Sequence, residues 1–492
     1  MELPKRFTLC FGDGIGPEIT QSVLKILEAS GVPLSYDIIE VGEKLYRRGI
    51  TSGIDDSSWE VLLKNRFFLK APITTPQGGG YKSLNVTIRK TLGLFANIRP
   101  CQAYAPFVKT RHPQMDLIII RENEEDLYAG IEYRQTPDVY QCLKLITRSG
   151  SEKIIRFAYE FARQRGRKRI SCFTKDNIMK LTDGLFHQLF DSIGQEYPEL
   201  QKDHYIIDIG AARLADSPER FDVIVTLNLY GDIISDIAAQ IAGSVGLAGS
   251  ANVGSHGSMY EAVHGSAPDI AGQNRANPSG LLMAAVFMLN DMGWSQYATL
   301  IENAWKKTIE DGIHTPDIKG EMTRKMVSTT EMTQAIIDRL GEEPQQLPTS
   351  RPSTHSQSLR DFSNLVQSSC SENRPCEIND GPIRECVGVD VFIYEPTSQA
   401  HQIAARMLPI LNDLGYELVM ISNRGVKVWP HGRLETHCVD HWRCRLMKKN
   451  KQNAIRLGQL LESLENHGWD IIKTENLYHY DGKPGYSLGQ GQ

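Results

Sequence analysis

The sequence predicts an α/β protein in two parts, a large region of alternating strands and helices followed by a small α+β domain. Short apolar runs of strand type alternate with amphipathic stretches of helical period through roughly the first 340 residues. Residues 341–380 are rich in Pro, Ser, Gln, Glu and Asn and poor in apolar side chains, which is typical of a linker. At 492 residues the chain is also too long for one hydrophobic core.

The composition excludes several classes of protein. A hydrophobic content of 41% and a charged content of 23% are ordinary for a globular protein. The net charge of −5 leaves no basic excess to neutralise phosphates, so we expect no nucleic-acid partner. The apolar runs are too short to span a bilayer and the amino terminus has no signal or transit pattern, so we expect no membrane partner. Nine cysteines without a signal indicate reduced thiols and a cytoplasmic location.

The amino-terminal segment has the order strand, tight loop, helix, and its loop reads G-D-G-I-G-P-E. Two glycines fit a dinucleotide-binding fingerprint, but Pro17 occupies the position of the third. Asp13 would also place a negative charge beside a pyrophosphate. The loop therefore argues against a Rossmann fingerprint.

Residues 70–99 predict a pocket for a small molecule with several negative charges. A triple glycine, residues 78–80, lets backbone approach a ligand closely. If Ser83 begins a helix, its hydroxyl and the free N–H groups of the first turn would combine with nearby arginines to bind carboxylates. The polar and basic side chains of this stretch are Lys70, Lys82, Ser83, Asn85, Arg89, Lys90 and Arg99. An ordinary glycine-rich loop is the alternative.

Further candidates follow predicted strands, because the carboxyl ends of strands line the ligand crevice of open α/β sheets. Arg121 ends one buried strand and Tyr128 lies shortly after it, whereas we interpret residues 124–126 as a solvated turn. Lys175 follows the predicted strand 169–173, although a surface lysine is the simpler interpretation from this pattern alone.

Asp232 and Asp236 are four residues apart on a predicted helix, so their carboxylates share one face about 6 Å apart. No basic residue stands between them in the sequence, and a hard cation such as Mg²⁺ or Mn²⁺ would relieve their repulsion. The alternative is a solvated helix start, where acids near the positive dipole end are common. Asp208 lies near the end of a separate predicted strand, residues 205–209.

Four motifs together resemble the decarboxylating β-hydroxyacid dehydrogenases, the family of isocitrate, 3-isopropylmalate, homoisocitrate and tartrate dehydrogenases. They are residues 70–99, R-E-N-E-E-D-L-Y-A-G, N-L-Y-G-D-I-I-S-D and H-G-S-A-P-D-I-A-G-Q, and the similarity covers roughly residues 5–340. The resemblance implies a non-Rossmann isocitrate/isopropylmalate dehydrogenase-like fold, and a homodimer or higher oligomer with an active site shared between subunits. The implied large domain is 1–94 with 243–340, and the small domain is 95–242 with a dimer clasp near 127–148.

The resemblance also implies a substrate. S-L-N-V-T-I-R is similar to the isocitrate version of the motif, in which Ser83 and Asn85 contact the extra carboxylate. Arg89, Arg99 and Arg121 would bind the other two carboxylates. The implied reaction is the oxidative decarboxylation of isocitrate to 2-oxoglutarate in the tricarboxylic acid cycle, with homoisocitrate or 3-isopropylmalate as alternative substrates.

The cofactor prediction depends on Asp269 and Ile270, where similar bacterial NADP enzymes carry Lys-Tyr. A carboxylate would accept a hydrogen bond from the ribose 2′-hydroxyl and repel a 2′-phosphate, and Pro316 replaces a further phosphate-binding tyrosine. We therefore predict NAD. The cofactor-binding residues that the resemblance implies are Lys70, Thr75, His264, Gly265, Ser266, Ala267, Asp269, Ile270 and Asn277.

Catalytic roles follow from the same resemblance. Asp232 and Asp236, with Asp208 of the partner subunit, would bind Mg²⁺ or Mn²⁺ beside the substrate hydroxyl. Lys175, also reaching across the dimer, would act as base or proton relay. Tyr128 is the expected acid that protonates the enolate left after loss of CO₂.

The tail, about residues 381–492, has the element order of a small split βαβ sandwich. Some bacterial isocitrate dehydrogenases similarly carry an extra carboxyl-terminal domain, which favours a packing or oligomerisation role; a regulatory ligand-binding module is the alternative. The tail also contains a group of potential zinc ligands whose spacing is not that of a structural zinc site. These are His437, Cys438, His441 and Cys444.

Overall fold

The computed structural model describes residues 5–50, 52–74, 83–352, 359, 382–432, 436–449 and 456–488. The chain divides into two compact units, Met1–Ala129 with Lys144–Glu372, and Gly130–Leu143 with Asn373–Gln492. Among the described helices, none has the length and apolar character needed to cross a bilayer.

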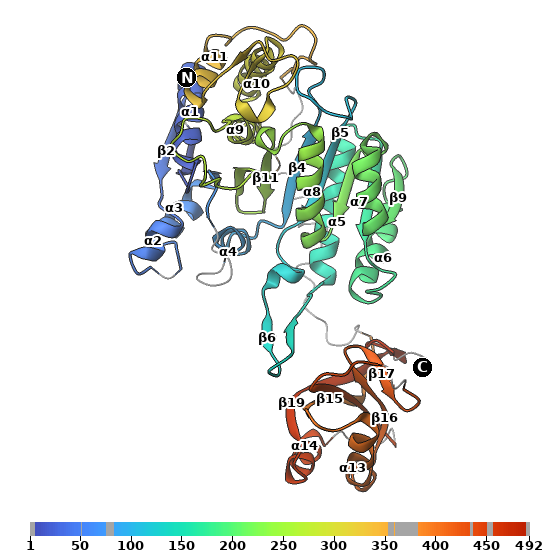
Figure 1. Ribbon diagram of the computed structural model, residues 1–492. Coiled ribbons are helices and arrows are strands. Elements are labelled where there is room, and N and C mark those ends of the chain that lie inside the picture. Colours follow the sequence, from blue (N-terminus) through green and yellow to red (C-terminus); the bar gives the residue numbers. More distant parts are fainter. Residues whose placement is uncertain are drawn as a thin grey trace. The chain divides into compact units, whose positions relative to one another are not determined.

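A ten-stranded sheet forms the centre of the first unit (Figure 1). In spatial order its strands are β2 (Leu34–Ile38), β1 (Lys5–Cys10), β3 (Phe67–Lys70), β12 (Ser258–Ala262), β11 (Gly249–Val253), β4 (Ala96–Gln102), β5 (Asp116–Glu122), β10 (Val223–Thr226), β8 (Arg169–Thr174) and β9 (Gln201–Ile206). The four strands at each end of the sheet run parallel to one another, whereas β11 and β4 pair antiparallel on both sides. Two parallel halves are thus joined by two antiparallel strands.

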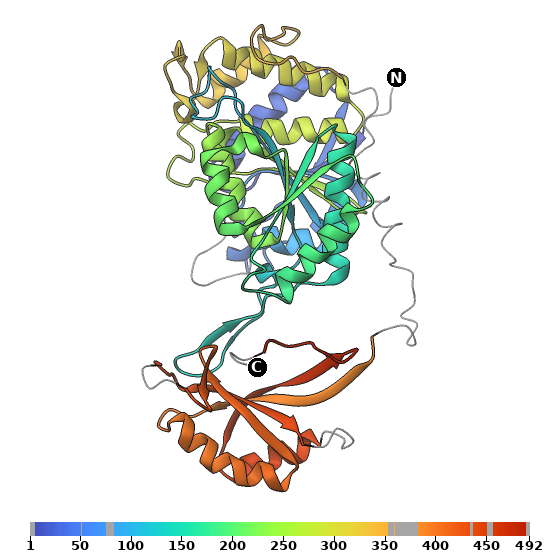
Figure 2. The same cartoon turned by 90° about the vertical axis from the view of Figure 1, so that its right-hand side faces the viewer.

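Helices cover both faces of the sheet, because side chains alternate along each buried strand. In β5, Ile118 and Ile120 join the core that contains α5 (Arg148–Gln164), whereas Leu117 and Ile119 join the core that contains α8 (Asn228–Ala242). Figure 2 shows these two helices on opposite sides of the strands. The other helices of this unit are α1 (Gly16–Ala29), α2 (Glu43–Arg47), α3 (Asp56–Asn65), α4 (Leu84–Thr91), α6 (Thr182–Gly194), α7 (Ile207–Asp216), α9 (Ser279–Asp291), α10 (Ser295–Glu310) and α11 (Thr329–Ile337).

The loop after β1 is shaped by close packing of backbone. Gly14 has φ +59°, and a Cβ there would lie 2.0 Å from the carbonyl oxygen of Ser266. Asp13 does not face an open loop, because its Oδ2 accepts a hydrogen bond from the backbone N–H of Thr74 at 3.0 Å. The glycines therefore join three loops of the fold, in agreement with the prediction that they are not a Rossmann fingerprint.

The second unit has a six-stranded antiparallel sheet with α13 (Ala400–Asp413) and α14 (Leu457–Asn466) packed against it. Its strands in spatial order are β17 (Val426–Trp429), β16 (Tyr416–Asn423), β18 (His441–Lys448), β15 (Arg384–Tyr394), β19 (Asp470–Tyr480) and β20 (Lys483–Pro484). Strand β18 separates β15 from β16, and β15 separates β18 from β19. This order is that of two split βαβ units.

The hairpin of β6 (Glu132–Arg134) and β7 (Tyr140–Cys142), at the position of the expected clasp, belongs to this second unit. Thr136 at its tip donates a hydrogen bond from Oγ1 to Oδ1 of Asp440 at 2.6 Å, and both side chains are buried. Lys473 donates to Gln141 at 2.8 Å. The hairpin and the tail therefore form one packed body.

The α/β class and the separate small carboxyl-terminal α+β domain predicted from the sequence are confirmed, and the sheet of that domain is antiparallel. The sequence analysis did not predict the central strands β4, β11, β12 and β18, although β4 and β18 do alternate polar and apolar residues. The strand predicted at 205–209 ends at Ile206, so Asp208 lies in the first turn of α7. Gln345 and Gln346, inside the predicted linker, pack on α10 by donating backbone hydrogen bonds to Glu310.

Candidate active site

A polar cavity of about 270 Å³ lies within the first unit, where the carboxyl ends of β3, β12 and β5 face α4 and α8. This is where open α/β sheets place ligands. Eleven of the predicted site residues line it: Lys70, Ser83, Asn85, Arg89, Arg99, Arg121, Tyr128, Asp232, Asp236, His264 and Gly265. Thr75 lies outside the described residues, as do Gly78, Gly79, Gly80 and Lys82.

Glu261, which the sequence analysis did not predict, binds two of the cavity's cations. Its carboxylate lies 2.7 Å from Nζ of Lys70 and 2.8 Å from Nη2 of Arg89, and all three side chains are buried. Burial opposes ionisation of Glu261, but the attraction of the two cations is larger and holds its pKa well below the usual range. A charged residue inside the apolar strand S-M-Y-E-A was the signal that could have identified it.

Arg99 and Arg121 approach the acidic pair on α8. Arg121 donates from Nη1 to Asp232, and from Nε and Nη2 to Asn228 at 3.1 and 2.8 Å. It fits because Gly231 presents no Cβ, which would lie 2.5 Å from the arginine's Cγ. Burial, with repulsion from the other two arginines of the cavity, lowers the pKa of Arg121 to about 10.

Arg99 contacts both acids, at 3.4 Å from Asp232 and 3.2 Å from Asp236. The sequence-based description of the pair as lacking a basic neighbour was therefore incomplete, because β4 brings an arginine from more than 130 residues away. Burial opposes ionisation of Asp232, but Arg121 and Arg99 outweigh it and lower its pKa. Burial and repulsion from Asp232 together raise the pKa of Asp236.

The acidic pair fits a hard divalent cation. Asp236 is the more exposed of the two, with 64% of its side chain accessible against 37% for Asp232, so its carboxylate can reach a ligand in the cavity. Carboxylate oxygens open to a polar cavity are the ligands that Mg²⁺ and Mn²⁺ prefer.

Tyr128, in the 3₁₀ turn Leu127–Ala129, donates its hydroxyl to Oδ2 of Asp232 at 2.5 Å. The Arg121 guanidinium lies 4.9 Å from the centre of its ring. Burial, aided by the charge of Asp232, raises the pKa of the phenol, so Tyr128 retains its proton at neutral pH.

Three buried polar atoms of the cavity have no hydrogen-bond partner within the described residues: Oδ1 of Asn85, Nε of Arg89 and Nε2 of His264. Such atoms cost free energy unless a ligand or water satisfies them, so the cavity is built for a polar ligand. Ser83 occupies the N-cap position of α4, as predicted, but its side chain does not cap the first turn.

Lys175 and Asp208 do not line this cavity. They form an ion pair with each other, with Nζ 2.7 Å from Oδ2, and 66% of the Asp208 side chain is exposed. The hydrogen bond from Lys175 lowers the pKa of Asp208. Asp183, buried in α6, accepts a hydrogen bond from the backbone N–H of Lys175 at 2.7 Å and fixes the turn after β8.

The remaining predicted cofactor residues follow β12 in one loop. The Ser266 hydroxyl lies 2.9 Å from that of Thr74, and Asn277 donates to Asp317 at 3.0 Å. Ala267 adopts a positive φ of 37°, and Ile270 donates its backbone N–H to the Ala267 carbonyl. Asp269 lies on an exposed turn.

The interpretation of residues 124–126 as a solvated turn was wrong for Asp126. Its side chain is fully buried, accepts the backbone N–H of Leu229 at 2.9 Å, and lies 3.5 Å from Nζ of Lys144. Glu122 is buried too, and burial raises its pKa to about 8. Asp126 therefore joins Lys144 to the start of α8, whereas Glu122 accepts backbone hydrogen bonds from Glu124 and Glu125.

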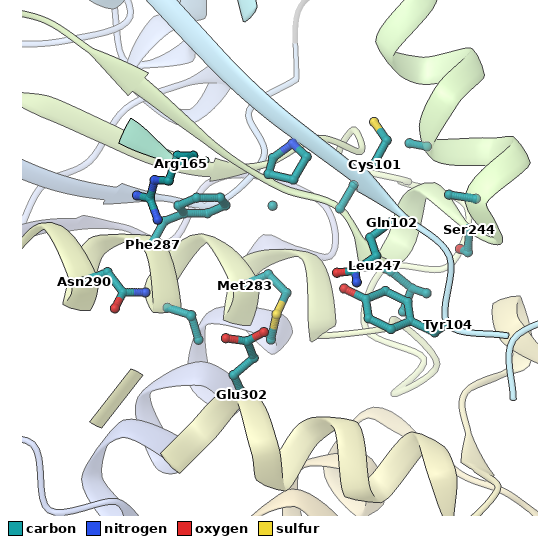
Figure 3. Close-up of a pocket in the computed structure, with 16 residues that line it drawn as sticks. Cys101, Gln102, Tyr104, Arg165, Ser244, Leu247, Met283, Phe287, Asn290 and Glu302 are labelled. Atoms are coloured by element: carbon teal, nitrogen blue, oxygen red, sulfur yellow. The ribbon is translucent and has the colours of Figure 1, made fainter. Parts of the chain in front are cut away.

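A second cavity, of about 240 Å³, has a different lining (Figure 3). Arg165 and Glu302 are its only charged side chains among the described residues, and Tyr104, Met283 and Phe287 supply apolar surface. Figure 3 shows Arg165 beside Phe287, away from Glu302. One arginine cannot neutralise several carboxylates. The first cavity, lined by Arg89, Arg99 and Arg121 and called the cationic cavity below, is therefore the better candidate for binding a polyanion.

The fold and the cationic cavity define an α/β protein in which three arginines line a polar cavity beside paired carboxylates. The model of the isocitrate/isopropylmalate dehydrogenase family matches residues 6–336, and that of the bacterial isocitrate dehydrogenase C-terminal domain matches residues 384–492. The chain belongs to the isocitrate/isopropylmalate dehydrogenase family.

Relatives match over the full length. The chain is 54% identical to "Isocitrate dehydrogenase [NADP]" of Rickettsia bellii over 491 residues, 99% of each chain. It is 41% identical to the protein of that name in Thermus thermophilus, over 99% of this chain and 96% of the other. The crystal structure of the TT0538 protein from Thermus thermophilus superimposes with a TM-score of 0.90 at 40% identity, covering 100% of this chain and 98% of that one.

These comparisons overturn the prediction of NAD as cofactor, because the full-length relatives carry NADP in their names. The prediction gave too much weight to Asp269. A carboxylate on an exposed turn is solvated and screened, and its side chain can rotate away, so it repels a phosphate only weakly.

Proposed function

We propose that this protein catalyses the oxidative decarboxylation of isocitrate to 2-oxoglutarate and CO₂ with reduction of NADP. The observation that carries the proposal is the cavity itself, which gathers Arg89, Arg99 and Arg121 around unsatisfied polar atoms beside two carboxylates. The names of the full-length relatives support the substrate and the cofactor.

In the proposed complex, the arginines bind carboxylates of the substrate, and bidentate guanidinium contacts suit that role. Ser83 and Asn85 line the cavity, and in this complex they would face the carboxylate that distinguishes isocitrate from 3-isopropylmalate. Rotation of the Asn85 amide presents its NH₂ in place of Oδ1, so the same side chain can donate to a carboxylate. Loss of these donors should weaken discrimination between the two substrates.

Asp232 and Asp236 would hold Mg²⁺ or Mn²⁺, with Asp208 of the partner subunit as a third ligand. When bound, the cation supplies a Lewis acid next to the substrate hydroxyl and the carbonyl that it becomes. Lys175 would hold the hydroxyl proton, and Tyr128, which keeps its own proton at neutral pH, would donate to the carbon that loses CO₂.

The separation of Lys175 and Asp208 from the cavity supports a site shared between subunits. Within one chain these two side chains pair with each other and line no part of the cavity. We infer that a homodimer completes the site. Lys70 and the loop of residues 264–277 would bind the cofactor; a cytoplasmic location stays a prediction from the sequence.

For the tail we propose a packing role, since Thr136 and Asp440 form a buried hydrogen bond between the hairpin and the tail. Asp440→Ala removes the acceptor of this hydrogen bond and should make the oligomer dissociate at a higher protein concentration in analytical ultracentrifugation, whereas the exposed control Asp413→Ala should not. A shift in the response to small-molecule effectors, with unchanged assembly, would instead favour the regulatory module.

One assay tests the main proposal. The purified full chain with Mn²⁺ is given isocitrate, homoisocitrate or 3-isopropylmalate, each with NADP or NAD, and reduced cofactor is followed by absorbance. We expect the highest kcat/KM for isocitrate with NADP. A higher value for either alternative acid, or no turnover with any of the three, would contradict the proposal.

A further inference from the structure

A cluster outside the cavity combines two imidazoles and one carboxylate. Asp176 follows β8, His187 lies on α6 and His204 lies on β9, so three elements contribute one residue each. Their candidate ligand atoms all lie within 4.8 Å of one another. Among the described residues, this is the one group of three or more His, Cys, Asp or Glu side chains so arranged.

The distances suit a metal ion after small side-chain rotations. Nδ1 of His187 lies 2.7 Å from Oδ2 of Asp176, and Nε2 of His204 lies 3.9 Å from Oδ1. Ligands at about 2.0 Å in a tetrahedron are separated by roughly 3.3 Å, between these two values. The imidazole rings are stacked, with centroids 3.6 Å apart, so one must turn to direct its lone pair at a common ion.

The surroundings support ligation. Nε2 of His187 lies 3.5 Å from the carboxylate of Asp191. If Nε2 carries the proton and donates it to this carboxylate, the lone pair of Nδ1 is available to a metal. The three side chains are between 18% and 26% exposed, so an ion could reach them from solvent. Two nitrogens and one oxygen suit Zn²⁺, Co²⁺ or Ni²⁺ better than Mg²⁺, which prefers oxygen ligands alone.

A metal-free network is the alternative explanation. Nε2 of His204, one of the candidate ligand atoms, shares a hydrogen bond of 2.8 Å with the Thr174 hydroxyl, and Nδ1 of His187 shares one of 2.7 Å with Asp176. In that case the cluster would only fasten β8 and β9 to α6, and no ion would be retained.

We propose that Asp176, His187 and His204 bind a divalent transition metal of the Zn²⁺ type, separate from the cation site at Asp232 and Asp236. Asp176 directly follows Lys175, whose backbone N–H bonds to Asp183. A bound ion would therefore hold the turn that positions Lys175. The binding claim does not depend on the proposed function.

The test is a titration of metal-free full-length protein with Co²⁺ in the presence of excess Mg²⁺, followed by the visible absorption of four-coordinate Co²⁺. We expect one equivalent per chain to bind at this site. The double variant His187→Gln/His204→Gln should weaken binding at least about tenfold, and the exposed control His401→Gln should leave it unchanged. Thiolate ligation by cysteine would be recognised by its separate near-ultraviolet charge-transfer band.

A second measurement tests the proposal even if the His187→Gln/His204→Gln variant folds poorly. Asp191→Asn leaves the three ligands in place and should weaken Co²⁺ binding about tenfold with little change in circular dichroism. Zn²⁺ should also raise Tm of the wild type and not of the double variant. No binding by the wild type, or binding that survives the double substitution, would overturn the proposal.

Discussion

The cationic cavity and the Lys175–Asp208 pair differ in how much of their environment one chain provides. In the cavity, Arg121 and Glu261 are buried and each is held by at least two partners. Lys175 and Asp208 form an ion pair with each other, and most of the Asp208 side chain is exposed. The cavity is preorganised by contacts within one chain, whereas the Lys175–Asp208 pair is accessible to a second subunit.

The largest effect should come from removing either half of the proposed shared site. Asp232→Asn removes the carboxylate that contacts Arg99, Arg121 and Tyr128, and Lys175→Met removes the proposed proton carrier. Each should lower kcat on the order of 10³-fold, the size expected when a proton-transfer group or a metal ligand is lost. Initial rates with isocitrate, NADP and Mn²⁺ measure this, with circular dichroism as a folding control.

Hybrid dimers test whether the two halves of the proposed site come from one subunit or from two. If the two halves come from different subunits, co-expressing the two inactive variants leaves one intact site in each hybrid, and random pairing restores about a quarter of wild-type activity. If both halves act within one chain, the mixture stays inactive. Differently tagged subunits allow the hybrids to be purified before the assay.

Glu261→Gln tests the preorganisation of the cavity. It leaves Lys70 and Arg89 buried without their counter-ion, and we expect a loss of about 3 kcal/mol in the free energy of unfolding at pH 7. Because the pKa of Glu261 is depressed, its contribution is complete above the ordinary carboxyl pKa and decreases below it. The difference from wild type should shrink by roughly 1 kcal/mol between pH 7 and pH 4 in urea titrations. A constant difference would contradict the ion-pair account.

Tyr128→Phe keeps the ring against Arg121 but removes the proton that Asp232 accepts. Decarboxylation and protonation should slow by about 10², while the oxidation step loses less. Single-turnover formation of reduced cofactor, compared with steady-state release of 2-oxoglutarate, separates the two steps. Equal losses would exclude Tyr128 as the acid.

The smallest effect is expected at the rim of the cavity. Ser83→Ala should raise KM for isocitrate about tenfold with little change in kcat, because one hydrogen bond to a charged group is lost. Thr91→Ala, two turns further along α4, exposed and outside the cavity lining, is the control and should leave KM unchanged. An unchanged KM in the serine variant would remove Ser83 from the substrate contacts.

The sequence predicted the parts of this site that have local patterns. Asp232 and Asp236 share a helix, and Ser83 and Asn85 mark the start of another, so spacing alone was informative. Glu261 and Arg99 were harder to interpret, because their partners lie 133 to 191 residues away or across strands that the pattern did not reveal. The cofactor prediction failed for a related reason, since a charge in a sequence carries no information about its solvation.

The unbroken sheet has a mechanical consequence. Buried amides link its middle strands: Asn252 accepts from Asn97 at 3.0 Å and from Asn123 at 3.1 Å, and it donates to Glu261 at 2.8 Å. Any bending of one half of the sheet toward the other must twist β11 and β4, which carry two of these amides. We therefore expect the middle of the sheet to resist such twisting. Because Asn252 donates to Glu261, a twist there would also displace the carboxylate that binds Lys70 and Arg89.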